Sequence, residues 1–215
     1  MEELTNKDLV EHLQNNTKVL EPGSKLEKAF LEIDRKDFID EDHEIEAYYD
    51  YPLPIGYGQT ISQPTIVAVM LSLLDLKKGE RVLDVGCGSG WTTVLIGYLV
   101  GAEGEVVAVD IIQEFVELTR NRAAAYQDKA QNIAVFHASE EKAIYSDHFD
   151  KILVNASFQS EESIPQSMRE ALKEGGRMVA PIANDLVVLQ KEEGELKELK
   201  RLPYTVSFVP YIEYF

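Results

Sequence analysis

Helical and strand-like patterns alternate along most of the chain. Apolar residues recur at helical spacing near the N-terminus, as at Leu9, Val10 and Leu13. From residue 81 on, short apolar runs are typical of buried strands and alternate with helical segments, which predicts a mostly parallel sheet with helices on both faces. The last strands have no helix between them and predict an antiparallel C-terminal edge. The expected helices span 5–15, 24–33, 64–74, 91–99, 114–126 and 163–172, and the expected strands span 81–85, 105–110, 132–136, 149–154, 177–181, 186–190, 196–202 and 205–209.

Residues 48–64, YYDYPLPIGYGQTISQP, interrupt this alternation. Their prolines and glycines predict a segment that is neither helix nor regular strand. The segment carries little charge, and a long loop inside a compact domain is usually functional. Ser62, which is followed closely by Pro64, is placed to N-cap the helix 64–74. Because that helix precedes the strand 81–85, the loop can lie across a ligand bound at the end of that strand.

The stretch Arg81–Trp91, RVLDVGCGSGW, joins a strand to a helix through a glycine turn. Glycine tolerates positive φ and lets a ligand approach the backbone closely. Strand, glycine turn and helix form a grip for a nucleotide cofactor, with amides and a helix N-terminus facing the ligand. The spacing fits neither a dinucleotide fingerprint, whose third glycine would stand at Trp91, nor a P-loop, which needs a lysine after the glycines. The alternative interpretation is a turn that only connects two elements.

Asp110 ends the next apolar strand, about 20 residues after the glycine turn. A carboxylate at this position can accept hydrogen bonds from both ribose hydroxyls of a nucleotide. It could instead N-cap the following helix. Taken together with the glycine turn, the position favours ribose binding.

Length and composition are typical of one globular domain: 215 residues, 45% hydrophobic and 27% charged. We divide this domain into N-terminal helices with the candidate active-site loop, 1–75, and a cofactor-binding core, 76–215. The formal net charge of −17 argues against a nucleic-acid partner, which needs a basic face. No apolar run reaches the ~20 residues of a membrane span, and the N-terminus does not resemble a signal peptide. We therefore expect a cytoplasmic protein without membrane association.

Cys87 is the single cysteine, so an internal disulfide is excluded and a reducing compartment fits. The thiol could be a nucleophile, but no histidine lies near it in the sequence. A small residue in a tight turn is the better interpretation. The four histidines show no metal-ligand spacing, so we expect no metal site. Nothing in the pattern indicates the oligomeric state.

Two stretches resemble known enzymes. The acidic residue in the strand 81–85 followed by G-x-G-x-G resembles motif I of S-adenosylmethionine-dependent methyltransferases. Residues 48–64 closely resemble the signature of protein-L-isoaspartate O-methyltransferases, Y-x-D-x-P-L-P-I-G followed by G-Q-T-I-S-Q-P. The chain is identified as a member of that family over roughly residues 33–211. The matching positions are Tyr49, Asp50, 52–56, 58–64 and 82–90, with further similarity at 34–38, 149–154, 174–181 and 208–210.

The resemblance implies a Rossmann-like α/β methyltransferase fold with an N-terminal helical extension. It also implies methylation of the free α-carboxylate of L-isoaspartyl residues in damaged proteins or peptides. S-adenosylmethionine would be the methyl donor and S-adenosylhomocysteine the product. The ester would collapse to a succinimide, part of which hydrolyses back to aspartate, so the reaction is one of protein repair. The implied partners are isoaspartyl peptides or unfolded protein segments.

The resemblance also implies the site residues. Ser62 would be the catalytic serine, which hydrogen-bonds the substrate carboxylate and positions it; its alternative role is only to cap its helix. No general base is required, because a carboxylate with a reference pKa near 4 is ionised at neutral pH. Asp50, Asn155 and Ala156 would bind substrate, although Asp50 could instead order the loop. The implied cofactor-binding residues are Gln59, Thr60, Ile61, Asp84, Gly86, Cys87, Gly88, Asp110, Ile111 and Ser139.

Individual cofactor contacts follow from the same resemblance. Residues 59–61 would shield the cofactor, and 86–88 would approach its methionine part through backbone atoms. Asp84 would meet its ammonium group directly or through water, and Asp110 would bind its ribose.

Three segments depart from the family pattern. Ala138-Ser139-Glu140 stands where the family has Gly-Asp-Gly, whose aspartate contacts the adenine; Ser139 can still hydrogen-bond, and Glu140 or Glu141 could supply a carboxylate. Asn155-Ala156-Ser157 replaces T-A-A-P and is followed by a longer loop. Pro181-Ile182-Ala183 replaces P-V-G.

These departures leave two alternatives open. One is a methyltransferase of this fold that acts on another carboxylate or on a small molecule. The other is a non-catalytic binding homologue that keeps the fold, with or without the cofactor; failure to bind S-adenosylmethionine would support it. A transfer-RNA methyltransferase shares the fold but is disfavoured by the acidic composition.

Overall fold

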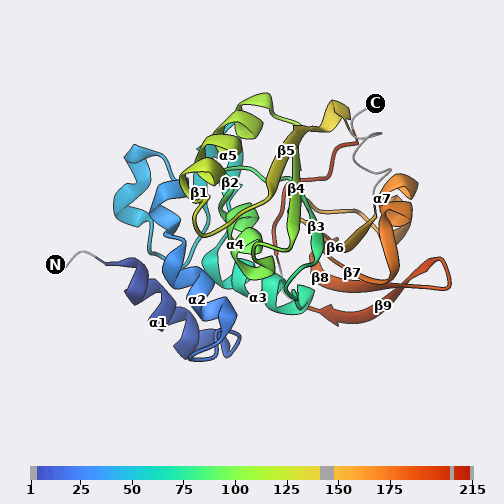
Figure 1. The fold of residues 1–215 in the computed structure, drawn as a ribbon, viewed down its shortest axis with the longest axis horizontal. Helices are drawn as coiled ribbons and strands as arrows, with labels where there is room; N and C mark the ends of the chain where they lie inside the picture. The colour runs from blue at the N-terminus through green and yellow to red at the C-terminus, as the bar shows by residue number, and fades with distance from the viewer. Residues whose placement is uncertain (1–3, 141–147, 204–205, 214–215) are drawn as a thin grey trace.

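A seven-stranded sheet forms the middle of the molecule and confirms the predicted α/β architecture (Figure 1). The computed structural model describes residues 4–140, 148–203 and 206–213. The strand order is β5-β4-β3-β6-β7-β8-β9; β3 to β7 run parallel, and β8 and β9 form the antiparallel edge that the sequence predicts. The strands are β3 (Arg81–Val85), β4 (Glu105–Asp110), β5 (Ile133–His137), β6 (Phe149–Val154), β7 (Leu172–Ile182), β8 (Asp185–Glu192) and β9 (Glu195–Leu202).

Helices cover both faces of the sheet. Leu153 of β6 packs into one apolar cluster with α3 and α4, whereas the adjacent Ile152 packs into another with α7. Successive strand residues point to opposite faces, so a strand covered on both sides reads as a continuous apolar run. The helices are α1 (Asn6–Thr17), α2 (Lys25–Glu32), α3 (Pro64–Leu74), α4 (Trp91–Val100), α5 (Gln113–Ala125) and α7 (Gln166–Ala171). No helix in the described ranges is long and apolar enough to span a bilayer.

The N-terminal helices α1 and α2 pack outside α3 and α4 (blue in Figure 1). Thr5 and Asp8 form a reciprocal capping box at the start of α1. Ser24 caps α2 by accepting the Glu27 amide at 3.0 Å, but the Glu27 carboxylate bonds the Gly23 amide instead of completing a second box. The buried side chains of both helices join the same cluster as α3 and α4. The helical extension is therefore a second layer on one face of the sheet.

Residues 53–61 form a β-hairpin, where the sequence predicted no regular strand. β1 (Leu53–Gly56) pairs antiparallel with β2 (Gln59–Ile61). Positive φ angles at 56–58 make the turn. Pro54 is tolerated because both strands of a two-stranded ribbon are edge strands. The glycines that argued against a strand thus belong to its turn.

Residues 206–209 form no strand, so the strand predicted there is wrong; its first residue lies outside the described ranges. Isolated backbone hydrogen bonds hold the segment instead. Ser157 donates its amide to the Val209 carbonyl at 2.8 Å, and Tyr211 donates its amide to the Ser157 carbonyl at 2.9 Å. These bonds bring the segment beside the residues that follow β6.

The helix predicted over 163–172 is shorter in the structure. A short 3-10 turn (Glu161–Ser163) comes first, and α7 begins at Gln166. Ile164 is extended because a following proline disfavours the α-helical conformation.

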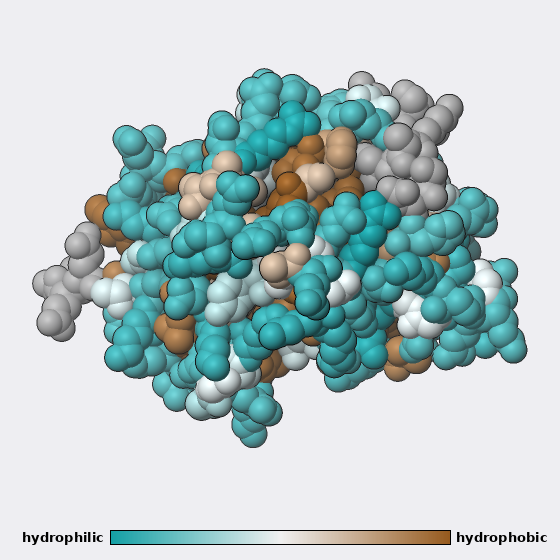
Figure 2. Space-filling model, viewed as in Figure 1, coloured by the Kyte–Doolittle hydropathy of each residue, from teal (hydrophilic) through white to brown (hydrophobic). Residues whose placement is uncertain are grey.

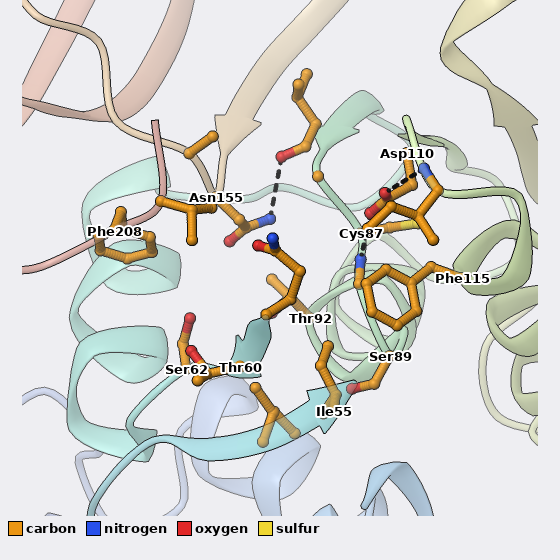
Figure 3. Close-up of a pocket in the computed structure, with 18 of the residues that line it drawn as sticks. Ile55, Thr60, Ser62, Cys87, Ser89, Thr92, Asp110, Phe115, Asn155 and Phe208 are labelled. Carbon is orange, nitrogen blue, oxygen red and sulfur yellow. Dashed lines mark hydrogen bonds between the residues drawn. The ribbon is translucent and has the colours of Figure 1, made fainter. Parts of the chain in front are cut away.

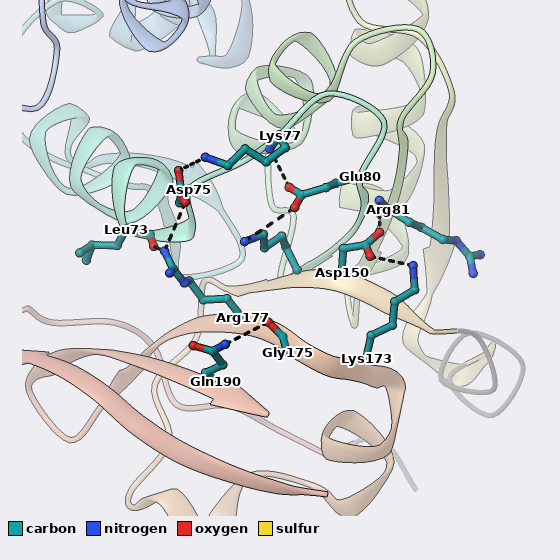
Figure 4. Close-up of polar contacts among 11 residues, drawn as sticks. Leu73, Asp75, Lys77, Glu80, Arg81, Asp150, Lys173, Gly175, Arg177 and Gln190 are labelled. Atoms are coloured by element: carbon teal, nitrogen blue, oxygen red, sulfur yellow. Dashed lines mark hydrogen bonds and ion pairs between the residues drawn. The ribbon is translucent and has the colours of Figure 1, made fainter. Parts of the chain in front are cut away.

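Polar contacts tie together the end of the sheet where the parallel strands begin (Figure 4). Asp150 accepts the Arg81 amide at 2.9 Å and the Lys173 ammonium at 2.7 Å. Lys151 lies 3.7 Å from Glu80. Because these charged groups pair with one another, this end of the sheet has a structural role. Ligands of open α/β sheets bind at the opposite end, at the carboxyl ends of the parallel strands, and the candidate site lies there.

Candidate active site

A cavity of about 760 Å³ lies at the carboxyl ends of β3, β4 and β6 (Figure 3). Its walls come from the hairpin, the glycine turn, the residues after β6 and the segment 206–212. The size and position suit a small-molecule site of an α/β protein. Figure 2 shows apolar surface gathered in a hollow of this region, over the upper ends of β4 and β5 in the same view.

The glycine turn has positive φ at Gly86, Gly88 and Gly90, as the spacing indicates. A Cβ at position 90 would lie 2.9 Å from the Thr119 hydroxyl, and one at position 88 would lie 3.2 Å from the Ile55 side chain. Glycine is thus required both by the backbone conformation and by the packing.

The amides of the turn are used inside the protein. Gly86 and Cys87 donate to the Val109 carbonyl at 2.8 and 3.1 Å, and Gly88 donates to the Asp110 carboxylate at 2.9 Å. This differs from the expectation of amides that face the ligand. A turn whose amides are occupied is not a phosphate cradle.

Asp110 and Ile111 line the cavity where β4 ends. The Asp110 carboxylate accepts the Gly88 amide with one oxygen and the Ile112 amide, at 3.0 Å, with the other. Burial raises the pKa of Asp110, and these two hydrogen bonds oppose the shift. A carboxylate has about four lone-pair sites, so acceptor capacity remains for two hydroxyl groups.

Asp84 does not line the cavity, in contrast to the expected contact with a ligand. Its side chain is buried and accepts the Thr93 hydroxyl at 2.6 Å and the Asn155 amide at 2.8 Å. Burial raises the pKa of Asp84 to about 6, against the effect of both hydrogen bonds. The geometry therefore connects Asp84 to the cavity only through Asn155.

Ser139 does not line the cavity either. Its hydroxyl lies 2.8 Å from Nδ1 of His137, whose Nε2 lies 3.0 Å from the Ile111 carbonyl. Ala138 lines the wall instead. Glu140 lies against the His137 amide, at 3.3 Å, and Glu141 is outside the described residues.

The second strand of the hairpin places Gln59, Thr60 and Ile61 on the cavity wall, and Ser62 directly after it lines the same wall. Figure 3 shows Ser62 and Thr60 at one end of the cavity, with Cys87, Asp110 and Phe115 at the other. The N-cap of α3 is Gln63 and has no side-chain cap bond, so the alternative that Ser62 caps its helix is wrong. The Ser62 side chain is instead part of the wall.

Asp50 supplies the missing cap from a distance. Its carboxylate accepts the Thr65 amide at 2.8 Å and the Thr65 hydroxyl at 2.7 Å, and Gln63 lies within 3.3 Å. Asp50 does not line the cavity. The expectation that it binds substrate therefore gives way to the alternative of ordering the loop, because both oxygens hold the start of α3.

Asn155 and Ala156 line the cavity after β6, but the longer loop that follows them does not. Phe158 turns into the core and packs against Tyr211, with ring centroids 4.9 Å apart. Ile182, in the third divergent segment, is also buried in that cluster. The longer loop and the third departure thus change the packing around the site, whereas Asn155 and Ala156 of the second departure change its wall.

Several lining residues were missed by the sequence reasoning. Ile55 and Phe115 look like ordinary core positions in the sequence, and both line the wall. The segment 206–212 also lines the wall; its residues 206–209 were predicted to form a strand, although the similarity to a family motif at 208–210 was a signal. Cys87, which was among the expected residues, lines the cavity as well. Burial raises the pKa of its thiol well above the usual range. This agrees with a packing residue and not with a nucleophile.

Comparison with known proteins identifies the family. A family model described as protein-L-isoaspartate(D-aspartate) O-methyltransferase (PCMT) matches residues 4–214. Protein-L-isoaspartate O-methyltransferase 2 of Archaeoglobus fulgidus is 38% identical over 191 residues, which are 86% of this chain and 84% of the relative. A protein-L-isoaspartate O-methyltransferase of Fervidobacterium nodosum is 37% identical over 205 residues, covering 94% of this chain and 98% of the relative.

A solved structure agrees with these relatives. A Plasmodium falciparum protein described as a protein-L-isoaspartate O-methyltransferase in complex with S-adenosyl-L-homocysteine has a TM-score of 0.78 and 25% identity. The match covers 99% of this chain and 100% of that one. The family model, the relatives and the fold agree along nearly the whole chain, which therefore belongs to the protein-L-isoaspartate(D-aspartate) O-methyltransferase family.

Proposed function

We propose that the protein transfers a methyl group from S-adenosylmethionine to the free α-carboxylate of L-isoaspartyl residues in damaged proteins or peptides. The observation that carries this proposal is that Ser62, directly after the hairpin, and the glycine turn line one cavity. The product would be a methyl ester that leads to repair through a succinimide. The curated relatives and the solved structure support the same activity.

The residues of the cavity fit S-adenosylmethionine. The ligand carries a ribose and cationic groups but no phosphate, in agreement with a turn whose amides are already occupied. Asp110 would accept the ribose hydroxyls, and the backbone of 86–88 would contact the methionine part. When bound, the cofactor supplies an electrophilic methyl group that a carboxylate oxygen can attack directly.

Other residues would complete the cofactor pocket. Residues 59–61 would cover the ligand, while Ile111 and Ala138 would contact its base. Asp84 would act on the ligand only by holding the Asn155 amide, because its own carboxylate is enclosed.

Ser62 would hold the substrate carboxylate by hydrogen bonding and align it for attack. Its role is positioning, because a carboxylate is ionised near neutral pH and needs no base. The rate enhancement would come from alignment and from removal of water in a cavity with apolar walls such as Ile55 and Phe208. Asn155 and Ala156 would contact the same end of the substrate.

We also propose the partners and location that follow from this activity. The substrates would be isoaspartyl peptides or unfolded protein segments, and nucleic acid would not bind because the net charge is −17. A cytoplasmic location is supported by the buried single thiol.

The decisive experiment compares wild type with Ser62→Ala on a synthetic isoaspartyl peptide and its normal aspartyl twin. We expect turnover of the isoaspartyl peptide alone and a loss of at least ~100-fold in kcat/KM for the variant, about 3 kcal/mol of transition-state stabilisation. Ser72→Ala is the matched control, because Ser72 is exposed on α3 and does not line the cavity. This control should retain full activity.

The other outcomes separate the alternatives. Absence of turnover with S-adenosylhomocysteine binding intact by calorimetry would replace the isoaspartyl substrate by another carboxylate or a small molecule. Absence of binding as well would favour the non-catalytic homologue.

A further inference from the structure

Arg35 is a fully buried cation that holds four backbone carbonyls. Its Nη1 donates to the carbonyls of Ala47 and Tyr49 at 2.8 and 3.1 Å, and its Nη2 to those of Tyr51 and Ser62 at 2.9 and 3.3 Å. The first three acceptors precede the hairpin, and the fourth follows it. One guanidinium therefore fastens both ends of the segment that forms the front wall of the cavity.

The charge of Arg35 is held without an ion pair. Among the described residues, Arg35 forms no ion pair with a carboxylate, and its Nε has no hydrogen-bond partner. Burial lowers the pKa of Arg35 to about 10, and the nearby charge of Asp50 opposes the shift. The side chain stays cationic at neutral pH. A buried charge without a counter-ion is costly, and this cost is offset by the four carbonyls that the guanidinium satisfies and that an apolar side chain would leave unpaired.

Arg35 also contacts the cofactor side of the cavity. Its guanidinium carbon lies 5.5 Å from the centre of the Trp91 ring. Trp91 is the first residue of α4, directly after the glycine turn, and lines the cavity. Arg35 therefore lies between the hairpin and the helix whose N-terminus follows the turn.

We propose that Arg35 is a positioning residue that sets where Ser62 stands relative to the bound cofactor. The planar guanidinium holds its two amino groups at a fixed separation. One amino group binds the carbonyls of residues 47 and 49, and the other binds those of residues 51 and 62. Lysine keeps the charge but offers one nitrogen without that geometry. The proposal rests on the proposed function, because its effect is exerted through Ser62.

The test is a double-mutant cycle of Arg35→Lys and Ser62→Ala, with kcat and KM measured for an isoaspartyl peptide. We expect Arg35→Lys to lower kcat at least ~30-fold, with the affinity for S-adenosylhomocysteine changed less than ~3-fold. In the double variant, Arg35→Lys should cost almost nothing beyond Ser62→Ala, because it acts through that hydroxyl. A residue that only stabilises the fold would not produce this non-additivity.

Three results would overturn the proposal. In the first, the losses of the two single variants multiply in the double variant. In the second, only the unfolding midpoint changes while kcat and KM stay at wild-type values. In the third, cofactor affinity falls as much as kcat. Failure of the proposed function is distinct, because it would show in the wild type and in Ser62→Ala before any Arg35 variant is considered.

A second measurement applies if Arg35→Lys does not fold. Arg35→Ala leaves a cavity that ethylguanidinium can enter. The proposal expects turnover to rise with ethylguanidinium concentration, and only when Ser62 is present. Recovery of the unfolding midpoint without recovery of turnover contradicts it.

Discussion

Asp84 is a carboxylate enclosed beneath the site, and its environment gives a definite dependence of stability on pH. Burial gives Asp84 a folded-state pKa of about 6, above the ordinary value of 3.8 for an aspartate. The unfolded chain therefore ionises first as the pH rises, and stability is lost between about pH 4 and pH 6. Relative to Asp84→Asn, the wild type should lose roughly 3 kcal/mol of unfolding free energy between pH 4 and pH 7, measured by urea unfolding.

Asp150 provides a control of opposite sign. Burial alone would raise its pKa, but the hydrogen bonds from Lys173 and the Arg81 amide lower it overall. Relative to Asp150→Asn, the wild type should gain stability as the pH rises through the acid range. For Asp84, the contradicting outcome would be an unfolding free energy that changes with pH equally in the wild type and in Asp84→Asn. Asp84 would then have an ordinary pKa in the folded protein.

At the scale of elements, the turn between β3 and α4 is limited by its neighbours as well as by its own conformation. Gly90 has a φ of +92°, and a Cβ there would lie 2.9 Å from the Thr119 hydroxyl. Gly175 has a φ of +74° with nothing within 4 Å of the corresponding Cβ. Gly175→Ala should cost about 1 kcal/mol of unfolding free energy from the left-handed conformation alone, and Gly90→Ala roughly 2–4 kcal/mol.

The difference in unfolding free energy between these two variants measures the cost of the contact with Thr119. Both substitutions place an alanine at a positive φ, so the cost of the backbone conformation is similar in the two variants. Chemical denaturation of the two purified variants is sufficient. If both lose the same stability, the Thr119 side chain must move aside without cost, and the turn is less tightly packed than its geometry indicates.

The elements differ in how well the sequence predicted them. The bounds of α3, β4 and β6 match their predicted ranges, because regular apolar patterns fix them locally. The β1–β2 hairpin was missed because its strands are short and rich in proline and glycine. The cap of α3 was assigned to Ser62, two residues before the helix, whereas it comes from Asp50 on a distant part of the loop. Local spacing cannot show a cap that only folding brings near.

The candidate site divides in the same way. Positions on the glycine turn and at the end of β4 line the cavity as expected, because backbone geometry places them there. Asp84 and Ser139 do not line the cavity. The direction of a polar side chain depends on its hydrogen-bond partners, and the sequence does not show which residues folding brings near. For Asp84 the partner is Thr93, and for Ser139 it is His137.

At the scale of the whole molecule, the net charge of −17 should influence which substrates are captured. A long-range negative field attracts cationic peptides and repels anionic ones. We expect an isoaspartyl peptide flanked by lysines to have a lower KM than one flanked by glutamates, by on the order of fivefold at ~0.02 M salt. The ratio should approach one at ~0.5 M salt, and a ratio independent of salt would place the discrimination in direct contacts.

The contact between the glycine turn and the hairpin has a consequence for sequence change over generations. A Cβ at position 88 would lie 3.2 Å from the Ile55 side chain, so the two positions share one volume. Any larger residue at 88 carries the strain of a φ of +51°, and the Ile55 side chain must in addition shift slightly or be replaced by a smaller one, for example valine. A smaller residue at 55 thus lowers the cost of a later substitution at 88, and the two parts of the chain inherit a joint history although they are 33 positions apart, from 55 to 88.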